Sequence, residues 1–228
     1  MTQSSLSGLR IVVSAGPTYE DLDPVRFLGN RSSGKMGFAI AAAAARRGAD
    51  TVLVAGPVHL STPDGVRRRD VRSAAQLRDA VIAALPADVY VGAAAVADWT
   101  PRTVAAQKLK KTDGVDTLTL ALVRTPDTLA EVATHPRRPR LVVGFAAETN
   151  DVERHARGKL EKKRLDLIAA NRVGIAGSGF ESDDNALVVY GRDVDGRDRE
   201  RALGPAPKAQ LADDLLDLVF EQLTAGPR

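Results

Sequence analysis

The sequence of 228 residues contains no cysteine, which excludes disulfide bonds, thiolate metal sites and a cysteine nucleophile. It also contains no apolar run of about 18 residues, so no membrane-spanning helix is expected. The first eight residues are polar and lack the basic and apolar segments of a signal peptide. Together, these absences fit a cytoplasmic protein with no membrane partner.

Aromatic residues are scarce as well, at 4% of the chain, so alanine, valine and leucine must form most of the core. Neither sign of charge dominates, because 32 lysines and arginines face 29 aspartates and glutamates. This balance argues against a nucleic-acid partner. The basic clusters at residues 67–69, 108–111 and 159–164 fit a solvated surface. Beside glycine-rich loops, such clusters also fit a site for a polyanionic small molecule.

Apolar runs alternate with amphipathic segments along the chain, which predicts an α/β fold. Strands are expected at residues 9–14, 51–55, 89–93, 141–145, 167–170 and 186–190, and helices at 36–47, 74–85, 151–165 and 208–223, with a further helix starting at 126–127. This order is typical of a Rossmann-like, doubly wound and mainly parallel sheet with helices on both faces. We expect residues 1–228 to form a single domain.

The middle of the chain interrupts this rhythm. Apolar and polar residues alternate at 118–122, next to a polar turn at Asp113, and predict a β-ribbon or flap over about 103–124 that stands off the main sheet. Lys108 and Lys110 would share one face of the first strand of this flap. With these two ammonium groups, the flap would close over a triphosphate. A solubilising strand edge is the alternative. The segments at 19–29 and 204–207 are interpreted as loops.

Loops follow four of the expected strands, at residues 15–18, 92–98, 145–150 and from 171 onward. In open α/β sheets, ligands bind at the carboxyl ends of the strands, so these loops predict a site. Small side chains from Gly92 to Ala97 would admit a flat ring, and Asp98 would accept a hydrogen bond from a ribose. The alternative is tight packing between sheet and helix, with Asp98 as a cap.

Residues 29–35 have the G-x-x-x-x-G-K spacing of a P-loop. However, Met36 stands where a P-loop has Ser or Thr, and the segment does not directly follow the first strand. What the segment does predict is a helix start with hydroxyl cap candidates and free N–H groups beside Lys35, which favours an anion. A plain N-cap with a surface lysine is the alternative.

Two further patterns narrow the function. No G-x-G-x-x-G follows the first strand, which argues against a nicotinamide-dependent oxidoreductase. Lys159 and Lys163 are four residues apart on an expected helix and share one face, either for an anionic ligand or for surface ion pairs. The three histidines have no metal-ligand spacing. A non-catalytic nucleotide-binding module stays open as an alternative to an enzyme.

Several segments in order resemble one family, the phosphopantothenoylcysteine synthetase domain (CoaB) of bacterial bifunctional coenzyme A enzymes. The matching segments are residues 14–50, 93–101, 108–111, 125–132, 142–151, 156–173 and 179–190. The resemblance implies a two-step ligase reaction. The carboxylate of 4′-phosphopantothenate attacks the α-phosphate of CTP and releases pyrophosphate, and the amine of L-cysteine then attacks the acyl-cytidylate and releases CMP.

The resemblance also implies roles for individual residues. Asn30 corresponds to the family asparagine of the second half-reaction, and Lys108 to the lysine of the first. Ser32, Ser33 and Gly34 are expected to bind the phosphate of the pantothenate substrate. The other family contacts to CTP, besides Lys108, fall on Gly92, Ala93, Ala94, Asp98, Pro126, Asp127, Thr128, Leu129, Phe145, Lys159 and Lys163.

Cofactors and partners are implied in the same way. Mg²⁺ is expected to bind together with CTP, and its protein ligands stay open. The choice of CTP over ATP rests on the bacterial character of the motifs. A homodimer is expected, with the flap reaching the second subunit. The family is usually fused to a flavin-dependent decarboxylase with a catalytic cysteine, so this chain is expected to be the synthetase half without flavin, excised or encoded alone.

Overall fold

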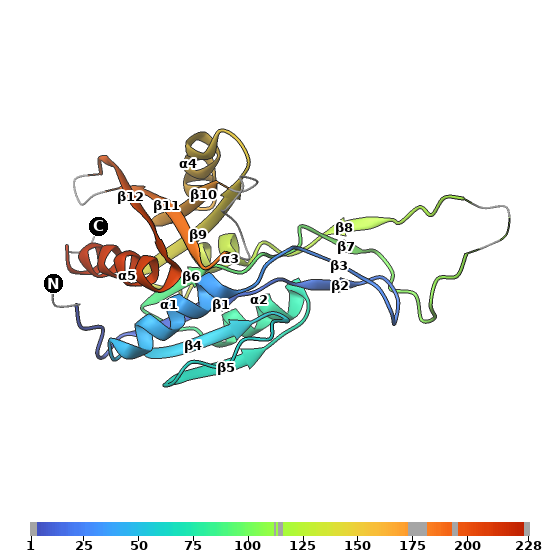
Figure 1. Ribbon diagram of the computed structural model, residues 1–228, viewed down its shortest axis with the longest axis horizontal. Coiled ribbons are helices and arrows are strands. Elements are labelled where there is room, and N and C mark those ends of the chain that lie inside the picture. Colours follow the sequence, from blue (N-terminus) through green and yellow to red (C-terminus); the bar gives the residue numbers. More distant parts are fainter. Residues whose placement is uncertain (1–3, 112, 114–115, 173–181, 193–195, 226–228) are drawn as a thin grey trace.

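The computed structural model describes residues 4–111, 113, 116–172, 182–192 and 196–225. Its main sheet has eight strands in the order β12-β11-β10-β9-β6-β1-β4-β5 (Figure 1). The strands are β1 (Arg10–Ala15), β4 (Asp50–Ala55), β5 (Val66–Asp70), β6 (Val89–Gly92), β9 (Leu141–Glu148), β10 (Leu167–Arg172), β11 (Asp184–Arg192) and β12 (Asp198–Pro207). From β10 to β5 all neighbours are parallel, and β11 and β12 are added antiparallel.

Helices cover both faces of this sheet, as the doubly wound pattern predicted. They are α1 (Lys35–Arg46), α2 (Ala74–Ala83), α3 (Thr128–Thr134), α4 (Val152–Lys162) and α5 (Lys208–Thr224). Helices α1 and α5 pack on one face, and α2, α3 and α4 on the other. Side chains alternate between the faces along each strand, so Ile11 and Val13 join the first cluster while Val12 joins the second.

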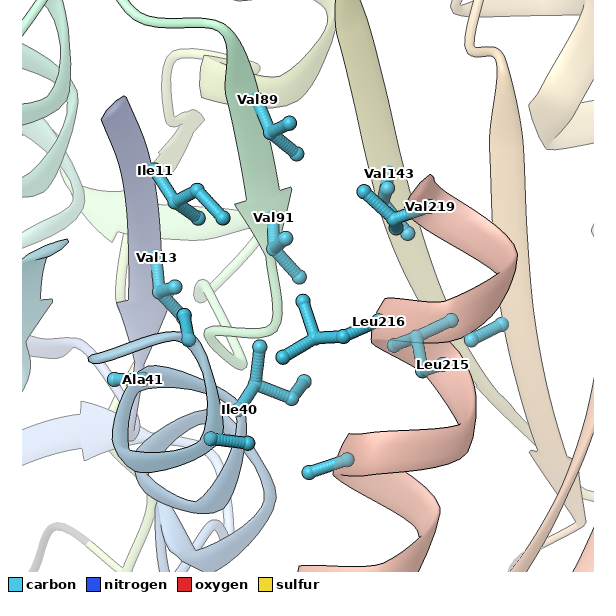
Figure 2. Packing of buried hydrophobic residues seen from close by; sticks show 14 of the residues in the cluster. Ile11, Val13, Ile40, Ala41, Val89, Val91, Val143, Leu215, Leu216 and Val219 are labelled. Carbon is cyan, nitrogen blue, oxygen red and sulfur yellow. The ribbon is translucent and has the colours of Figure 1, made fainter. Parts of the chain in front are cut away.

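The core between the sheet and helices α1 and α5 is built from aliphatic side chains. Ile40 of α1 and Leu216 of α5 lie together over Val13 and Val91 of the sheet (Figure 2). All four side chains are fully buried. The scarcity of aromatic residues is therefore met by branched aliphatic side chains, and α1 and α5 are fixed against the same face.

Two strands of the main sheet differ from the expectations from sequence. Strand β5 was not predicted, because three consecutive arginines make it look like a solvated segment. Such charges are common on an edge strand, where they discourage pairing with other chains. The expected loop at 204–207 is the end of β12, a second late strand that pairs with β11.

Two short ribbons stand beside the main sheet. Strands β2 (Tyr19–Asp21) and β3 (Phe27–Gly29) pair antiparallel, as do β7 (Trp99–Pro101) and β8 (Leu122–Arg124). In Figure 1 the four strands lie together at the side of the sheet away from both chain ends. The segment at 19–29, interpreted from sequence as a loop, is therefore a hairpin. We call residues 19–29 and 99–124 together the arm.

The predicted flap is confirmed as a projection but not as a long ribbon. Only its base is paired, and the described residues between β7 and β8 form no strand, including Lys108 and Lys110. The hairpin holds this segment through side chains instead: Asp23 Oδ2 accepts from the backbone N–H of Leu109 at 3.0 Å, and Arg26 donates to the carbonyl of Leu109 at 2.6 Å. Within the described part of the chain, no helix has both the length and the apolar character to cross a bilayer.

Candidate functional site

Two cavities adjoin at the carboxyl ends of the parallel strands, where the sequence placed a ligand site. The first has a volume of about 390 Å³ and lies between the starts of α1 and α5 and the loop after β6. The second has about 540 Å³ and lies between the same loop, the start of α3 and the end of α4. Ala94, Val96, Asp98 and Phe145 line both, so two ligands in these cavities would meet there.

Most of the predicted site residues come together in these cavities. Besides the shared residues, those lining the first cavity are Asn30, Ser32, Ser33, Gly34, Ala93 and Lys159. Those lining the second cavity alone are Gly92, Pro126, Asp127, Thr128, Leu129 and Lys163. Lys108 lines neither, because it is an exposed residue of the arm.

The start of α1 forms one wall of the first cavity. Its N-cap residue is Gly34, with φ 75°, and no side chain caps the helix. The prediction of a hydroxyl N-cap is therefore wrong, because the residue at this position is a glycine in the left-handed conformation. A Cβ atom on Gly37 would lie 2.5 Å from the Cβ of Ala15, so this glycine lets the helix start approach the end of β1.

The loop after β6 separates the two cavities and is tied to its surroundings. The side-chain amide of Asn30 donates to the carbonyls of Ala95, at 3.2 Å, and Val96, at 3.0 Å. Thr18 Oγ1 accepts from the N–H of Ala97 at 2.9 Å. Asp98 caps none of the described helices, which removes that alternative for its role.

The second cavity has a polar floor. Ser14 Oγ and the hydroxyl of Tyr90 are 2.9 Å apart, and both residues line it. Burial raises the pKa of Tyr90 to about 12, although its hydrogen bond to Ser14 acts in the opposite direction. Tyr90 therefore keeps its proton at neutral pH. A Cβ on Gly92 would lie 3.0 Å from Leu129, so this glycine also permits close packing of α3.

The predicted lysines of α4 each contact a carboxylate. Lys163 Nζ lies 2.9 Å from Oδ2 of Asp127, which also accepts from the N–H of Ala130 as the N-cap of α3. Lys159 Nζ lies 2.7 Å from Oε1 of Glu148 at the end of β9. One lysine faces each cavity, so the end of α4 borders both.

Five polar residues of the first cavity are not among the site residues expected from sequence. They are Arg31, Lys35, Asn171, Asn185 and Lys208. Asn185 lies in β11 and Lys208 is the first residue of α5, and both are buried. No local motif marks them, because the antiparallel addition of β11 and β12 is what brings them to this cavity.

The described residues contain no group of three or more histidine, aspartate or glutamate side chains that would hold a metal ion. The first cavity is lined by one carboxylate, Asp98, and the second by two, Asp98 and Asp127. This arrangement suits a magnesium ion that arrives on a triphosphate, since Mg²⁺ commonly binds through phosphates with one or two carboxylates.

Comparison with known proteins identifies the family. Residues 6–223 match the family model described as the C-terminal domain of the DNA/pantothenate metabolism flavoprotein. The chain belongs to this family. Proteins similar to this chain include the coenzyme A biosynthesis bifunctional protein CoaBC of several bacteria. The resemblance inferred from the motifs is thereby confirmed.

CoaBC of Vibrio cholerae is 49% identical over 219 residues, which are 96% of this chain and 54% of that protein. CoaBC of Escherichia coli is 52% identical over 195 residues, which are 84% of this chain and 48% of that protein. The chain thus spans about half the length of these two CoaBC proteins.

Solved structures share the fold. The crystal structure of the C-terminal domain of CoaBC superposes with a TM-score of 0.79 at 36% identity, covering 97% of this chain and 98% of that one. A Cab2 mutant in complex with phosphopantothenate-cysteine gives a TM-score of 0.73 at 14% identity, covering 95% and 88%. At 14% identity, this similarity shows only that the two proteins share a fold.

Proposed function

We propose that this chain is a phosphopantothenate–cysteine ligase of coenzyme A biosynthesis that uses CTP. The observation that carries the proposal is the pair of adjoining cavities with a shared boundary at Asp98 and Phe145. A reaction between two bound substrates needs two sites whose reacting ends meet. The carboxylate of one ligand and the α-phosphate of the other would meet at this boundary.

The two cavities suit different ligands. The first has a helix start with a glycine N-cap and four cationic side chains, which suits the phosphate of 4′-phosphopantothenate. The second has small residues, a polar floor and Lys163, which suits the base and ribose of CTP. In the first step, a carboxylate oxygen of the pantothenate bonds to the α-phosphorus, and pyrophosphate leaves. A Mg²⁺ ion bound with the triphosphate would offset the charge of its phosphates.

In the second step, the amine of L-cysteine attacks the acyl carbon, loses a proton and displaces CMP. Asn30 lies in the first cavity against the loop that borders the second. To hold the mixed anhydride and stabilise the charge that develops on the acyl oxygen, its amide N–H groups would turn from the carbonyls of Ala95 and Val96 to that oxygen. The Cab2 complex holds phosphopantothenate-cysteine, which is the product of such a ligation, and thus supports this proposal.

Lys108 acts in the first step in our proposal, although it lies outside both cavities. Large apolar side chains are exposed on the arm that carries it, and this supports a homodimer in which the arms pack together. These side chains are Val25, Phe27, Trp99, Val104, Leu118, Leu120 and Leu122. In such a dimer, Lys108 of one subunit reaches the cavity of the other.

The bifunctional relatives are about twice as long as this chain. We propose that the ligase activity cooperates with a flavin-dependent decarboxylase, in the same polypeptide or in another. The present chain has no cysteine to serve that second activity, and no flavin is needed for ligation.

The deciding experiment measures pyrophosphate release with CTP, 4′-phosphopantothenate and L-cysteine, omitting one component at a time. We expect pyrophosphate only when CTP and 4′-phosphopantothenate are both present, and the amide product only when cysteine is added. Replacing CTP with ATP tests the nucleotide preference. Binding of CTP without any pyrophosphate release would instead support a non-catalytic nucleotide-binding module.

A further inference from the structure

Position 208 is an unusual place for a lysine. Its residue is only 6% exposed, although lysine is rarely buried to this degree. It is also the first residue of α5, where the positive end of the helix dipole disfavours a cation. Burial and the neighbouring Lys35 lower its pKa. Neither core packing nor helix stability accounts for a lysine at this position.

The surroundings of Lys208 are rich in positive charge. Helices α1 and α5 both begin at the carboxyl edge of the sheet, with Lys35 and Lys208 as their first residues. Both lysines line the first cavity, together with the buried Asn185. Among the described lining residues there are four cationic side chains and one carboxylate, Asp98. With Asp183 and Glu148 included, which contact Lys35 and Lys159, these cations still outnumber the described carboxylates by one, and this suits an anionic ligand.

A carboxylate already contacts one lysine of this pair. Asp183 Oδ1 lies 2.6 Å from Lys35 Nζ, and this contact lowers the pKa of Asp183. The Asp183 side chain is 88% exposed, so it can move into solvent without losing buried contacts. Lys208 Nζ also donates to the carbonyl of Ser182, which keeps it beside the same segment.

From this geometry we propose that Lys208 binds a phosphoryl group in the first cavity together with Lys35, and that Asp183 competes with this group for Lys35. The proposal rests on the proposed ligase function and adds a residue to its binding site. The phosphoryl group belongs either to 4′-phosphopantothenate or to the β,γ-diphosphate of CTP. Both carry the same chemistry, so the experiment must distinguish them.

The test is titration calorimetry of the full chain with four ligands: 4′-phosphopantothenate, pantothenate, CTP and CMP. Lys208→Met keeps the apolar stem and removes the charge. We expect it to weaken binding of one phosphorylated ligand by about 10- to 100-fold, as for loss of a charge-assisted hydrogen bond. If Lys208→Met weakens binding of 4′-phosphopantothenate but not of pantothenate, Lys208 binds the phosphate of 4′-phosphopantothenate. If it weakens binding of CTP but not of CMP, Lys208 binds the β,γ-diphosphate of CTP.

Three further variants guard against a folding defect. Arg67→Met removes an exposed charge on β5, outside both cavities, and should leave all four affinities unchanged. Asp183→Asn removes the competing carboxylate and should tighten binding of the same phosphorylated ligand several-fold. Lys208→Arg should retain more affinity than Lys208→Met. If Lys208→Met folds poorly, as judged by thermal unfolding, the Asp183→Asn result decides.

The outcomes separate this inference from the proposed function. Wild-type chain that binds neither 4′-phosphopantothenate nor CTP would refute the ligase function itself. Wild-type binding together with unchanged affinities in Lys208→Met would refute only the role of Lys208. Weaker binding in Asp183→Asn would show that the carboxylate supports the site instead of competing in it, and would also overturn the proposal.

Discussion

At the scale of single residues, Asn30 occupies the point where the chemistry is expected. Its amide donates to two carbonyls of the loop between the cavities, so the side chain is held in place before substrate binds. We predict that Asn30→Ala still releases pyrophosphate but forms the amide product about 10²–10³ times more slowly. Quenched-flow analysis of the acyl-cytidylate would check this. Normal product formation would contradict the role.

Lys108 provides the matched counterpart, because it is assigned to the other half of the reaction. We predict that Lys108→Gln slows pyrophosphate release itself by about 10²–10³, since its charge would offset charge building on the phosphates. Lys111→Gln, a neighbouring exposed lysine of the arm, serves as the control. Undiminished pyrophosphate release in Lys108→Gln would remove this lysine from the chemistry.

The difference between motif residues and missed residues is physical. Asp98 lies in a loop that follows an expected strand, and Lys163 shares a helix face with Lys159, so local patterns predict both, whereas the role of Asn30 follows from the family resemblance of its segment. Lys208 and Asn185 reach the first cavity only through the pairing of β10, β11 and β12. A single sequence does not encode such long-range pairing in any local pattern.

At the scale of the elements, two glycines in helices have opposite roles. Gly37 of α1 is buried against β1, and a Cβ there would lie 2.5 Å from that of Ala15. We predict that Gly37→Ala lowers the free energy of unfolding by about 1–3 kcal/mol through overpacking. Urea unfolding would measure it, and an unchanged midpoint would contradict the tight packing.

Gly158 of α4 is the matched control, because nothing lies within 4 Å of a Cβ added there. Gly158→Ala should raise the free energy of unfolding by about 0.5–1 kcal/mol, the usual gain on replacing an exposed helical glycine. If Gly158→Ala also lost stability, the loss in Gly37→Ala could not be attributed to overpacking against β1.

The tie between the two ribbons of the arm depends on Asp23. This buried carboxylate accepts from Arg26 and from the N–H groups of Val25 and Leu109, and these contacts hold its pKa well below the ordinary value. Because the pKa is lowered, the tie is fully present above the ordinary carboxyl pKa. It is lost only as the pH falls through the lowered value.

Asp23→Asn imitates that protonated state at neutral pH. We predict faster hydrogen exchange at the Leu109 amide, with the main sheet unaffected, because the tie holds only the arm. Asp21→Asn is the control, since Asp21 lies in the same hairpin but pairs with Arg72. Equal exchange rates at Leu109 in wild type and Asp23→Asn would contradict this account.

The elements also show where sequence patterns suffice. Buried parallel strands such as β1 and β4 are predicted well, because their apolar runs are continuous. Alternation at 118–122 predicted a strand, yet only Leu122 joins one, because no described neighbour offers these residues a ladder. Asp21, Asp23 and Pro24 suggested a loop. Asp23 and Pro24 do lie in the turn of the hairpin, whereas Asp21 is the last residue of β2.

At the scale of the whole molecule, the arm separates Lys108 from the cavities it is proposed to serve. It also gathers the exposed large apolar side chains of the described residues. A two-fold symmetric pair of arms would bury these side chains and bring each Lys108 to the other subunit. We therefore expect the wild-type chain to be a dimer by light scattering, and Leu118→Asp combined with Leu122→Asp to be a monomer.

If the site is shared between subunits, two inactive variants can complement each other. A mixed dimer of Asn30→Ala and Lys108→Gln chains contains one site with both residues intact and one with neither. Random mixing makes half of the dimers mixed, with half of their sites intact, so about a quarter of wild-type activity should return. The measurement is amide formation after the variants are unfolded and refolded together. With Asn30 and Lys108 acting from the same subunit, every site would carry one defect, and no activity would return.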